Sequence, residues 1–268
     1  MLPLNVTMNQ ETRIETDACL LIFDPHQDVE WMEAIIASER KHVSHVLLGG
    51  DYFDSDRPKV TAHAGRMCDS LVQLAGEWAD QITVLLGNHD VHYMETKRWC
   101  DLHRTPRAPH VNYRCSGYTT SRAAKIAKKL SWEFWRGCRL FQVVNGWLVS
   151  HAGVAGRFWP PAPDTSAAID ALEKECREAV EKLPFNNFEI LQAGEVRGGR
   201  PQAIGGITWL DFDREFVDGE VPLPQIFGHT TSHEGARQKG RSWCLDGHQT
   251  CYGILHRDGN LEIKERRS

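Results

Sequence analysis

The chain has 268 residues and a mass of 30.4 kDa; 41% of its residues are hydrophobic, 25% are charged, and its formal net charge is −5. This size suits one large α/β domain or two small ones. No apolar run approaches the ~20 residues that a membrane-spanning helix needs, the first residues lack the basic-then-apolar order of a secretory signal, and the net charge gives no reason to expect general nucleic-acid binding.

Alternating strands and helices are predicted for the first ninety residues. Apolar runs at 18–24, 45–51 and 82–88 predict buried strands, and helically spaced apolar residues at 29–41 and 64–79 predict the helices between them. Buried strands that alternate with helices indicate parallel pairing with right-handed crossovers.

Residues 92–139 interrupt this alternation. They carry eleven Lys and Arg residues against three Asp and Glu residues, and the stretch 121–135 predicts a helix. An insertion of this kind favours a basic, lid-like element over a linker, with a solvated basic helix as the plain alternative. If the insertion recruits a polyanion such as a nucleotide, turnover will fall steeply with added salt.

After residue 139 the pattern is mostly strands. They are expected at 139–145, 146–153, 224–229, 241–246, 252–257 and 260–265. Residues 166–183 predict an amphipathic helix, and 195–206 a flexible loop. The Asn-Gly pair at 145–146 and the Asp-Gly pair at 258–259 predict hairpin turns. The whole order favours a single domain of two sheets packed face to face, with helices outside.

The eight cysteines contain no C-x-x-C pair, which predicts reduced thiols in a cytoplasmic protein. One group of zinc-ligand side chains is closely spaced: Cys100, His103, His110 and Cys115. Its spacing fits no zinc ribbon or finger and two prolines interrupt it, so a zinc site there is the minor alternative.

Polar side chains follow one predicted strand after another. They are Asp24 and His26, Asp51 and Asp54, Asn88, His89 and Asp90, and, in the second half, His151 and His229. The carboxyl ends of strands form the ligand crevice of open α/β sheets. Each residue alone has an ordinary explanation, such as a helix cap, a turn or a core histidine. Residues that can bind a metal follow five predicted strands, however, and five such coincidences favour a metal site instead.

The residue types in this set indicate a particular chemistry. Aspartate, histidine and asparagine supply oxygen and nitrogen donors and no thiolate, which suits manganese, iron or zinc. One carboxylate shared by two cations holds them ~3.5–4 Å apart. Such a pair lowers the pKa of a trapped water and clamps a phosphoryl group for in-line attack.

The ordered set D-x-H, G-D-x-x-D, G-N-H-D, S-H-A-G and G-H-T resembles the calcineurin-like metallophosphoesterase superfamily. The resemblance implies a four-layer α/β/β/α sandwich of two mixed sheets with flanking helices. The forms "LVSHAG", "IFGHT", "ITWLDFDREF" and "CLDGHQTCYGILH" are similar to the phosphoprotein phosphatase branch and its symmetrical diadenosine tetraphosphatase relatives.

The resemblance also implies a role for each residue of the set. Asp24 and His26 would hold a first divalent ion, Asp51 would bridge two ions, and Asn88, His151 and His229 would hold the second, with manganese as the expected metal. A metal-bridging hydroxide would attack phosphorus in line, Asn88 would contact the substrate, and His89, oriented by Asp54, would protonate the leaving group. Asp90 is expected to support its neighbours rather than bind metal.

Three departures from the resemblance are visible. Thr231 stands where many members have the second histidine of G-H-x-H, and "FDPHQD" stands where the branch has G-D-x-H-G. The branch usually has an arginine directly after the second Asp of G-D-x-x-D, where this chain has Ser55. Arg57 is therefore the expected phosphate clamp, with an arginine of the basic insertion as the alternative.

The function predicted first is a two-metal phosphomonoesterase that acts on a phosphoprotein or a small phosphorylated metabolite. A phosphodiesterase or nucleotide pyrophosphohydrolase, acting on nucleotides or nucleic-acid ends, is the alternative, because fold does not fix substrate. A metal-binding scaffold without catalysis is the third; His89 beside a full ligand set weighs against it. No membrane partner is expected, and nucleic acid is not favoured.

Overall fold

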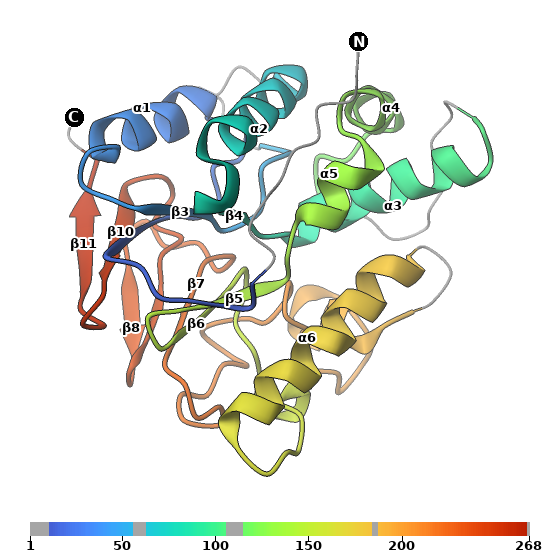
Figure 1. Cartoon of the computed structure of the whole chain (residues 1–268). Coiled ribbons are helices and arrows are strands. Elements are labelled where there is room, and N and C mark those ends of the chain that lie inside the picture. The colour runs from blue at the N-terminus through green and yellow to red at the C-terminus, as the bar shows by residue number, and fades with distance from the viewer. Residues whose placement is uncertain (1–10, 56–62, 106–114, 184–186, 267–268) are drawn as a thin grey trace.

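Two β-sheets form the centre of the molecule (Figure 1). The computed structural model describes residues 11–55, 63–105, 115–183 and 187–266. Within these residues the five-stranded sheet has the order β11-β10-β2-β3-β4, and the six-stranded sheet has the order β1-β5-β6-β7-β9-β8. The first comprises β2 (Ala18–Ile22), β3 (His45–Leu48), β4 (Ile82–Val84), β10 (Cys251–His256) and β11 (Leu261–Glu265). The second comprises β1 (Arg13–Ile14), β5 (Phe141–Val144), β6 (Trp147–Ser150), β7 (Gln225–Phe227), β8 (Arg237–Lys239) and β9 (Ser242–Cys244).

Helices cover the outer side of each sheet. They are α1 (Val29–Glu39), α2 (Ala64–Trp78), α3 (Asn88–Leu102), α4 (Thr120–Lys129), α5 (Trp132–Gly137) and α6 (Thr165–Lys182). In Figure 1, α1 and α2 lie beside the sheet of β3 and β4, and α6 lies on the opposite side of the molecule, next to β5 and β6. None of the described helices combines the length and the apolar character that crossing a membrane requires.

The alternation of side chains along the strands builds the layers. On β2, Leu21 belongs to the cluster between the sheets, with Val149 of β6 and Ile226 of β7. Its neighbours Leu20 and Ile22 point the other way, into the cluster shared with the helices. Because successive strand residues face opposite sides, one all-apolar strand serves two cores. The α/β fold of two mixed sheets with flanking helices is therefore confirmed.

The parallel pairing predicted for β2, β3 and β4 is also confirmed, and so is the hairpin turn at Asn145 and Gly146. β2 runs parallel to β3, and β3 parallel to β4, while β10 joins β2 antiparallel. The β5–β6 hairpin pairs Val144 with Trp147 across a two-residue turn. Asn145 and Gly146 have φ values of 47° and 82°, the left-handed values that such a turn requires.

Several predicted boundaries are wrong. The strand predicted at 82–88 ends at Val84, and α3 begins at Asn88. The Asp90 carboxylate accepts a hydrogen bond from the Gly87 backbone N–H at 2.9 Å, which closes a first helical turn where the sequence suggested a strand end. The helix predicted at 121–135 is two helices, α4 and α5, because Ser131 breaks the run and caps α5.

Two strands were not predicted at all. β1 is two residues long, and β8 is an edge strand of Arg237, Gln238 and Lys239 with no buried member. Neither carries an apolar alternation that a sequence pattern can detect. Both lie at an edge of the six-stranded sheet, so the missed strands leave the centre of the predicted fold unchanged.

Candidate metal centre and active site

The predicted ligand and acid residues meet at the carboxyl ends of the strands. Asp24 and His26 follow β2, Asp51 and Asp54 follow β3, Asn88 and His89 begin α3 after β4, His151 follows β6, and His229 follows β7. A cleft of about 590 Å³ opens over them. A larger groove of about 870 Å³ against α1 and β11 contains neither of the metal-ligand clusters found among the described residues.

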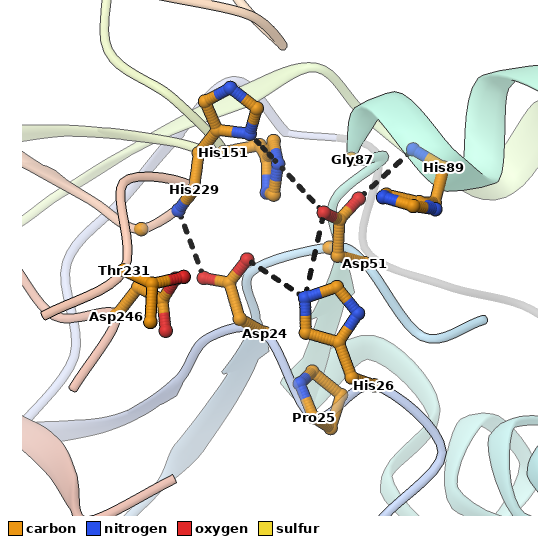
Figure 2. Close-up of polar contacts among 12 residues, drawn as sticks. Asp24, Pro25, His26, Asp51, Gly87, His89, His151, His229, Thr231 and Asp246 are labelled. Atoms are coloured by element: carbon orange, nitrogen blue, oxygen red, sulfur yellow. Dashed lines mark hydrogen bonds and ion pairs between the residues drawn. The ribbon is translucent and has the colours of Figure 1, made fainter. Parts of the chain in front are cut away.

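One ligand cluster consists of Asp24, His26 and Asp51, whose ligand atoms lie within 4.8 Å of one another. His26 Nε2 is 3.9 Å from Asp24 Oδ1 and 3.9 Å from Asp51 Oδ2 (Figure 2). These separations leave room for a divalent ion at about 2.0–2.2 Å from each atom.

A second cluster consists of Asp51, His151 and His229. His151 Nε2 lies 3.5 Å from Asp51 Oδ2, 3.2 Å from His229 Nδ1 and 3.1 Å from Asn88 Oδ1. Asn88 therefore adds a fourth donor to this cluster. Since Asp51 belongs to both clusters, the two positions share one carboxylate, which is the arrangement of a two-metal site.

Backbone carbonyls fix the orientation of two of these histidines. His151 Nδ1 is 2.9 Å from the Gly49 carbonyl oxygen, and His26 Nδ1 is 2.7 Å from that of Asp54. A carbonyl oxygen only accepts, so each Nδ1 donates its proton. In both rings Nε2 is then the nitrogen that faces the cluster, as in a metal-ligating histidine.

The acids of the site suit bound cations. Asp24 and Asp51 are only 1% and 2% exposed, and Asp24 Oδ1 has no hydrogen-bond partner among the described residues. Burial, with Asp246 and Asp51 nearby, raises the pKa of Asp24. Burial acts in the same direction on Asp51, but His151, His89 and His26 outweigh it, so the net pKa of Asp51 is lowered. Buried carboxylates this close together need compensating positive charge, so the donor set fits divalent ions.

Two glycines leave the space in which these carboxylates lie. A Cβ on Gly87 would stand 2.1 Å from Asp51 Oδ1, and one on Gly228 would stand 2.0 Å from Asp24 Oδ2. Any larger residue at either position would displace the carboxylate group of a candidate ligand. The glycines of G-N-H-D and G-H-T are therefore spatial requirements of the centre.

The backbone of the site is strained. Left-handed φ values occur at Asp24 (51°), His26 (41°), Asp51 (58°), Asp54 (65°) and His229 (66°). Such values are uncommon outside glycine and cost of order 1–3 kcal/mol each. Their concentration in one site shows that the surrounding fold holds these side chains in place against a local cost.

His89 and Asp54 form a pair beside the clusters. His89 Nδ1 is 3.1 Å from Asp54 Oδ2, and the His89 ring lies edge-on to that of His26 at 5.5 Å. Burial lowers the pKa of His89, but the carboxylates of Asp51 and Asp54 outweigh it, and the net pKa is raised. The arrangement therefore favours a protonated imidazole next to the metal positions.

Asp90 supports the backbone of the site. Its Oδ2 accepts from the N–H groups of Asp51 at 2.7 Å and Gly87 at 2.9 Å, and its Oδ1 from that of Tyr52 at 3.1 Å. Burial and the nearby Asp51 raise the pKa of Asp90 to about 7. Asp90 belongs to neither ligand cluster in the described chain, which agrees with the supporting role expected for it.

Two sequence predictions concern residues that the structure does not describe fully. Arg57 and His110 lie outside the described residues. Cys100, His103 and Cys115 do not form a metal-ligand cluster within the described part of the chain. Cys115 instead lines the active-site cleft, where its Sγ accepts a hydrogen bond from Asn88 Nδ2 at 3.1 Å.

Sequence reasoning missed several cleft residues: Arg197, Trp209, His233 and His248. Arg197 comes from the segment expected to be a flexible loop, but its Nη2 is held by Asp211 at 2.9 Å and Thr230 at 3.0 Å. No motif spacing marked it. The signal that was available is an arginine followed by two glycines ahead of the "ITWLDFD" stretch.

A family comparison agrees with this geometry. Residues 24–259 match the family model for calcineurin-like phosphoesterases. This chain belongs to that family. It is accordingly a metal-dependent phosphoester hydrolase, and divalent ions are the cofactors of the calcineurin-like phosphoesterase centre described above.

Solved structures show the same fold at low sequence identity. A cold-active protein-tyrosine phosphatase of a psychrophilic Shewanella species is 14% identical, with a TM-score of 0.59 over 96% of this chain and 83% of that one. A point mutant of a cold-active protein tyrosine phosphatase is 15% identical, with a TM-score of 0.55 over 98% and 85%. A search of curated protein sequences gave no match.

Proposed function

We propose that this calcineurin-like phosphoesterase is a phosphomonoesterase with two divalent ions. Asp24, His26 and Asp51 are the ligands of one ion, and Asp51, Asn88, His151 and His229 those of the other. The observation that carries the proposal is that two ligand clusters share Asp51 and adjoin the His89–Asp54 pair. When bound, such ions polarise phosphoryl oxygens and lower the pKa of water.

Two residues are proposed to bind the phosphoryl group. Asn88 and Arg197 line the cleft and orient the phosphoryl group. Among the described residues, Arg197 is the proposed phosphate clamp, because a guanidinium pairs with two phosphate oxygens at once; Arg57, expected in this role, lies outside them. A monoester carries more negative charge than a diester, so an arginine in addition to two cations favours the monoester.

His89 is the general acid in this proposal. Its Nδ1 is held by Asp54, so its Nε2 delivers a proton to the oxygen of the leaving group. An alkoxide leaves poorly without that proton, and a positioned histidine contributes typically ~10²–10⁴-fold. This role gives the pair a catalytic purpose that a metal-binding scaffold would not need.

The proposal also covers the metal, the substrate class and the cellular location. Oxygen and nitrogen donors without a thiolate suit manganese first, with iron and zinc as alternatives. The substrate is a phosphorylated protein or small metabolite. None of the eight cysteines, all of which lie among the described residues, forms a disulfide, which supports a cytoplasmic location.

The experiment that tests the proposal compares two nitrophenyl substrates with manganese present. The chain should hydrolyse nitrophenyl phosphate in preference to bis-nitrophenyl phosphate, and Asp51→Asn should abolish both activities. Preference for the diester would replace this proposal with a phosphodiesterase or nucleotide pyrophosphohydrolase. Lack of turnover of either substrate would favour the scaffold.

A further inference from the structure

The segment 115–122 of the basic insertion packs against the active site, and the mechanism proposed above gives it no part. Cys115, Ser116 and Gly117 line the cleft, and α4 begins at Thr120. α4 packs against both α2 and α3, and α3 carries Asn88 and His89. The segment is therefore placed to act on site residues from outside the ligand clusters.

Arg122 connects this segment to the His89–Asp54 pair. Its Nη1 donates to the Gly117 carbonyl oxygen at 2.6 Å and also to Asp54 Oδ1. The Asp54 side chain is only 2% exposed. A buried carboxylate needs a partner of opposite charge, and Arg122 supplies one from an element outside the two sheets.

The two oxygens of Asp54 have different partners. Oδ1 accepts from the Tyr93 hydroxyl at 2.5 Å and from Arg122, whereas Oδ2 is 3.1 Å from His89 Nδ1. Two donors on Oδ1 restrict rotation of the carboxylate, so Oδ2 stays directed at His89. With the Nδ1 proton of His89 held there, Nε2 is the nitrogen left to face a substrate.

The same segment touches the metal-ligand side. Cys115 Sγ accepts from Asn88 Nδ2 at 3.1 Å, and this leaves Asn88 Oδ1 directed at His151 Nε2 at 3.1 Å. Gly117 has a φ of 84°, and a Cβ there would stand 2.9 Å from the Cβ of Asp54. The segment is thus packed closely against Asp54 and bonded to Asn88.

We propose that the 115–122 segment is a positioning element of the active site. In it Arg122, together with Tyr93, holds Asp54 so that Asp54 orients His89 for proton donation. The inference rests on the proposed function, since it requires His89 to be the general acid. Arg122 itself is a positioning residue that acts through Asp54 and does not bind the phosphoryl group.

The test uses leaving groups of different quality. Arg122→Gln should lower kcat for phenyl phosphate about 10–100-fold, which is less than the ~10²–10⁴-fold of a whole general acid because His89 itself is retained, and lower it far less for 2,4-dinitrophenyl phosphate. KM and the bound metal per chain should stay the same. Arg122→Lys should restore part of the loss. In a His89→Ala chain, Arg122→Gln should cause no further loss.

Lys129→Gln is the matched control, because Lys129 joins the same helix to Asp69 of α2 through an ion pair. It should leave turnover unchanged. Should Arg122→Gln fail to fold, Arg122→Lys and Tyr93→Phe carry the same comparison. Full kcat on phenyl phosphate, an equal rise in KM for both substrates, or a loss that persists beside His89→Ala would each overturn the inference. A His89→Ala chain with full turnover of phenyl phosphate would overturn the proposed acid instead.

Discussion

The two sides of the active site are built differently. On the metal-ligand side, Asp24, Asp51 and His151 are 1%, 2% and 0% exposed and follow strands of both sheets. On the acid side, the His89 side chain is 12% exposed and lies on α3, and its partner Asp54 is held by Arg122 of α4. The positions of the strand-borne candidate ligands therefore depend on the pairing of strands, whereas the proton transfer proposed for His89 depends on helix packing in the basic segment. The two sides should respond separately to mutation.

The largest expected effect comes from the residue common to both ligand clusters. Asp51→Asn should remove bound metal and activity together, with a loss of about 10³-fold or more, because charge stabilisation by metal ions is worth several kcal/mol and each 1.4 kcal/mol is tenfold. Metal analysis and turnover of nitrophenyl phosphate measure both. A variant with its full metal content and turnover would break the assignment of Asp51.

The next effect should appear on the acid side alone. His89→Ala should keep its bound metal and lose about 10²–10⁴-fold in kcat with a poor leaving group, and much less with a good one. Turnover of phenyl and 2,4-dinitrophenyl phosphates, with metal analysis of the same samples, checks this. Equal losses on the two substrates would argue against His89 as the general acid.

A smaller effect should come from the proposed phosphate clamp. Arg197→Gln should raise KM for nitrophenyl phosphate about 10–100-fold, since hydrogen bonds to charged groups contribute roughly 1.5–3 kcal/mol. Arg200→Gln is the control, because Arg200 pairs with the exposed Glu189 and does not line the active-site cleft. An unchanged KM for Arg197→Gln would remove Arg197 from the binding machinery.

The last effect is on stability and not on turnover, and it concerns the five-stranded sheet. Burial lowers the pKa of His45, on β3, to about 4, whereas the unfolded chain takes up this proton near pH 6.5. Stability is then full above pH 6.5 and falls by about 3 kcal/mol as pH drops to about 4. His45→Gln should reduce the difference between urea unfolding at pH 7 and pH 4.5. His256→Gln, at a half-exposed position, is the control and should leave that difference unchanged. If the two variants behave alike, His45 is not the source of the pH dependence.

The positions of residues on the metal-ligand side could be predicted from the sequence because they follow strong apolar runs. Asp24 comes directly after such a run and Asp51 follows one after two glycines, so periodicity placed them at strand ends. The contacts of the acid side were harder to predict from the sequence. α3 begins inside "GNHD" through the Asp90 cap, and Arg122 reaches Asp54 across 68 residues of chain, a tertiary contact that no local pattern encodes. Arg197 was hidden for the same reason, since Asp211 and Thr230 hold it in place.

The most direct test of the account is a titration of manganese into chelator-stripped chain, with bound metal and turnover of nitrophenyl phosphate followed together. The shared Asp51 carboxylate predicts that two ions bind per chain and that turnover reaches its full value only as the second binds. His89→Ala should bind the same two ions, and its turnover of phenyl phosphate, which has a poor leaving group, should stay about 10²–10⁴-fold lower at full metal content. Full turnover with one ion per chain, or with none, would contradict the two-metal centre.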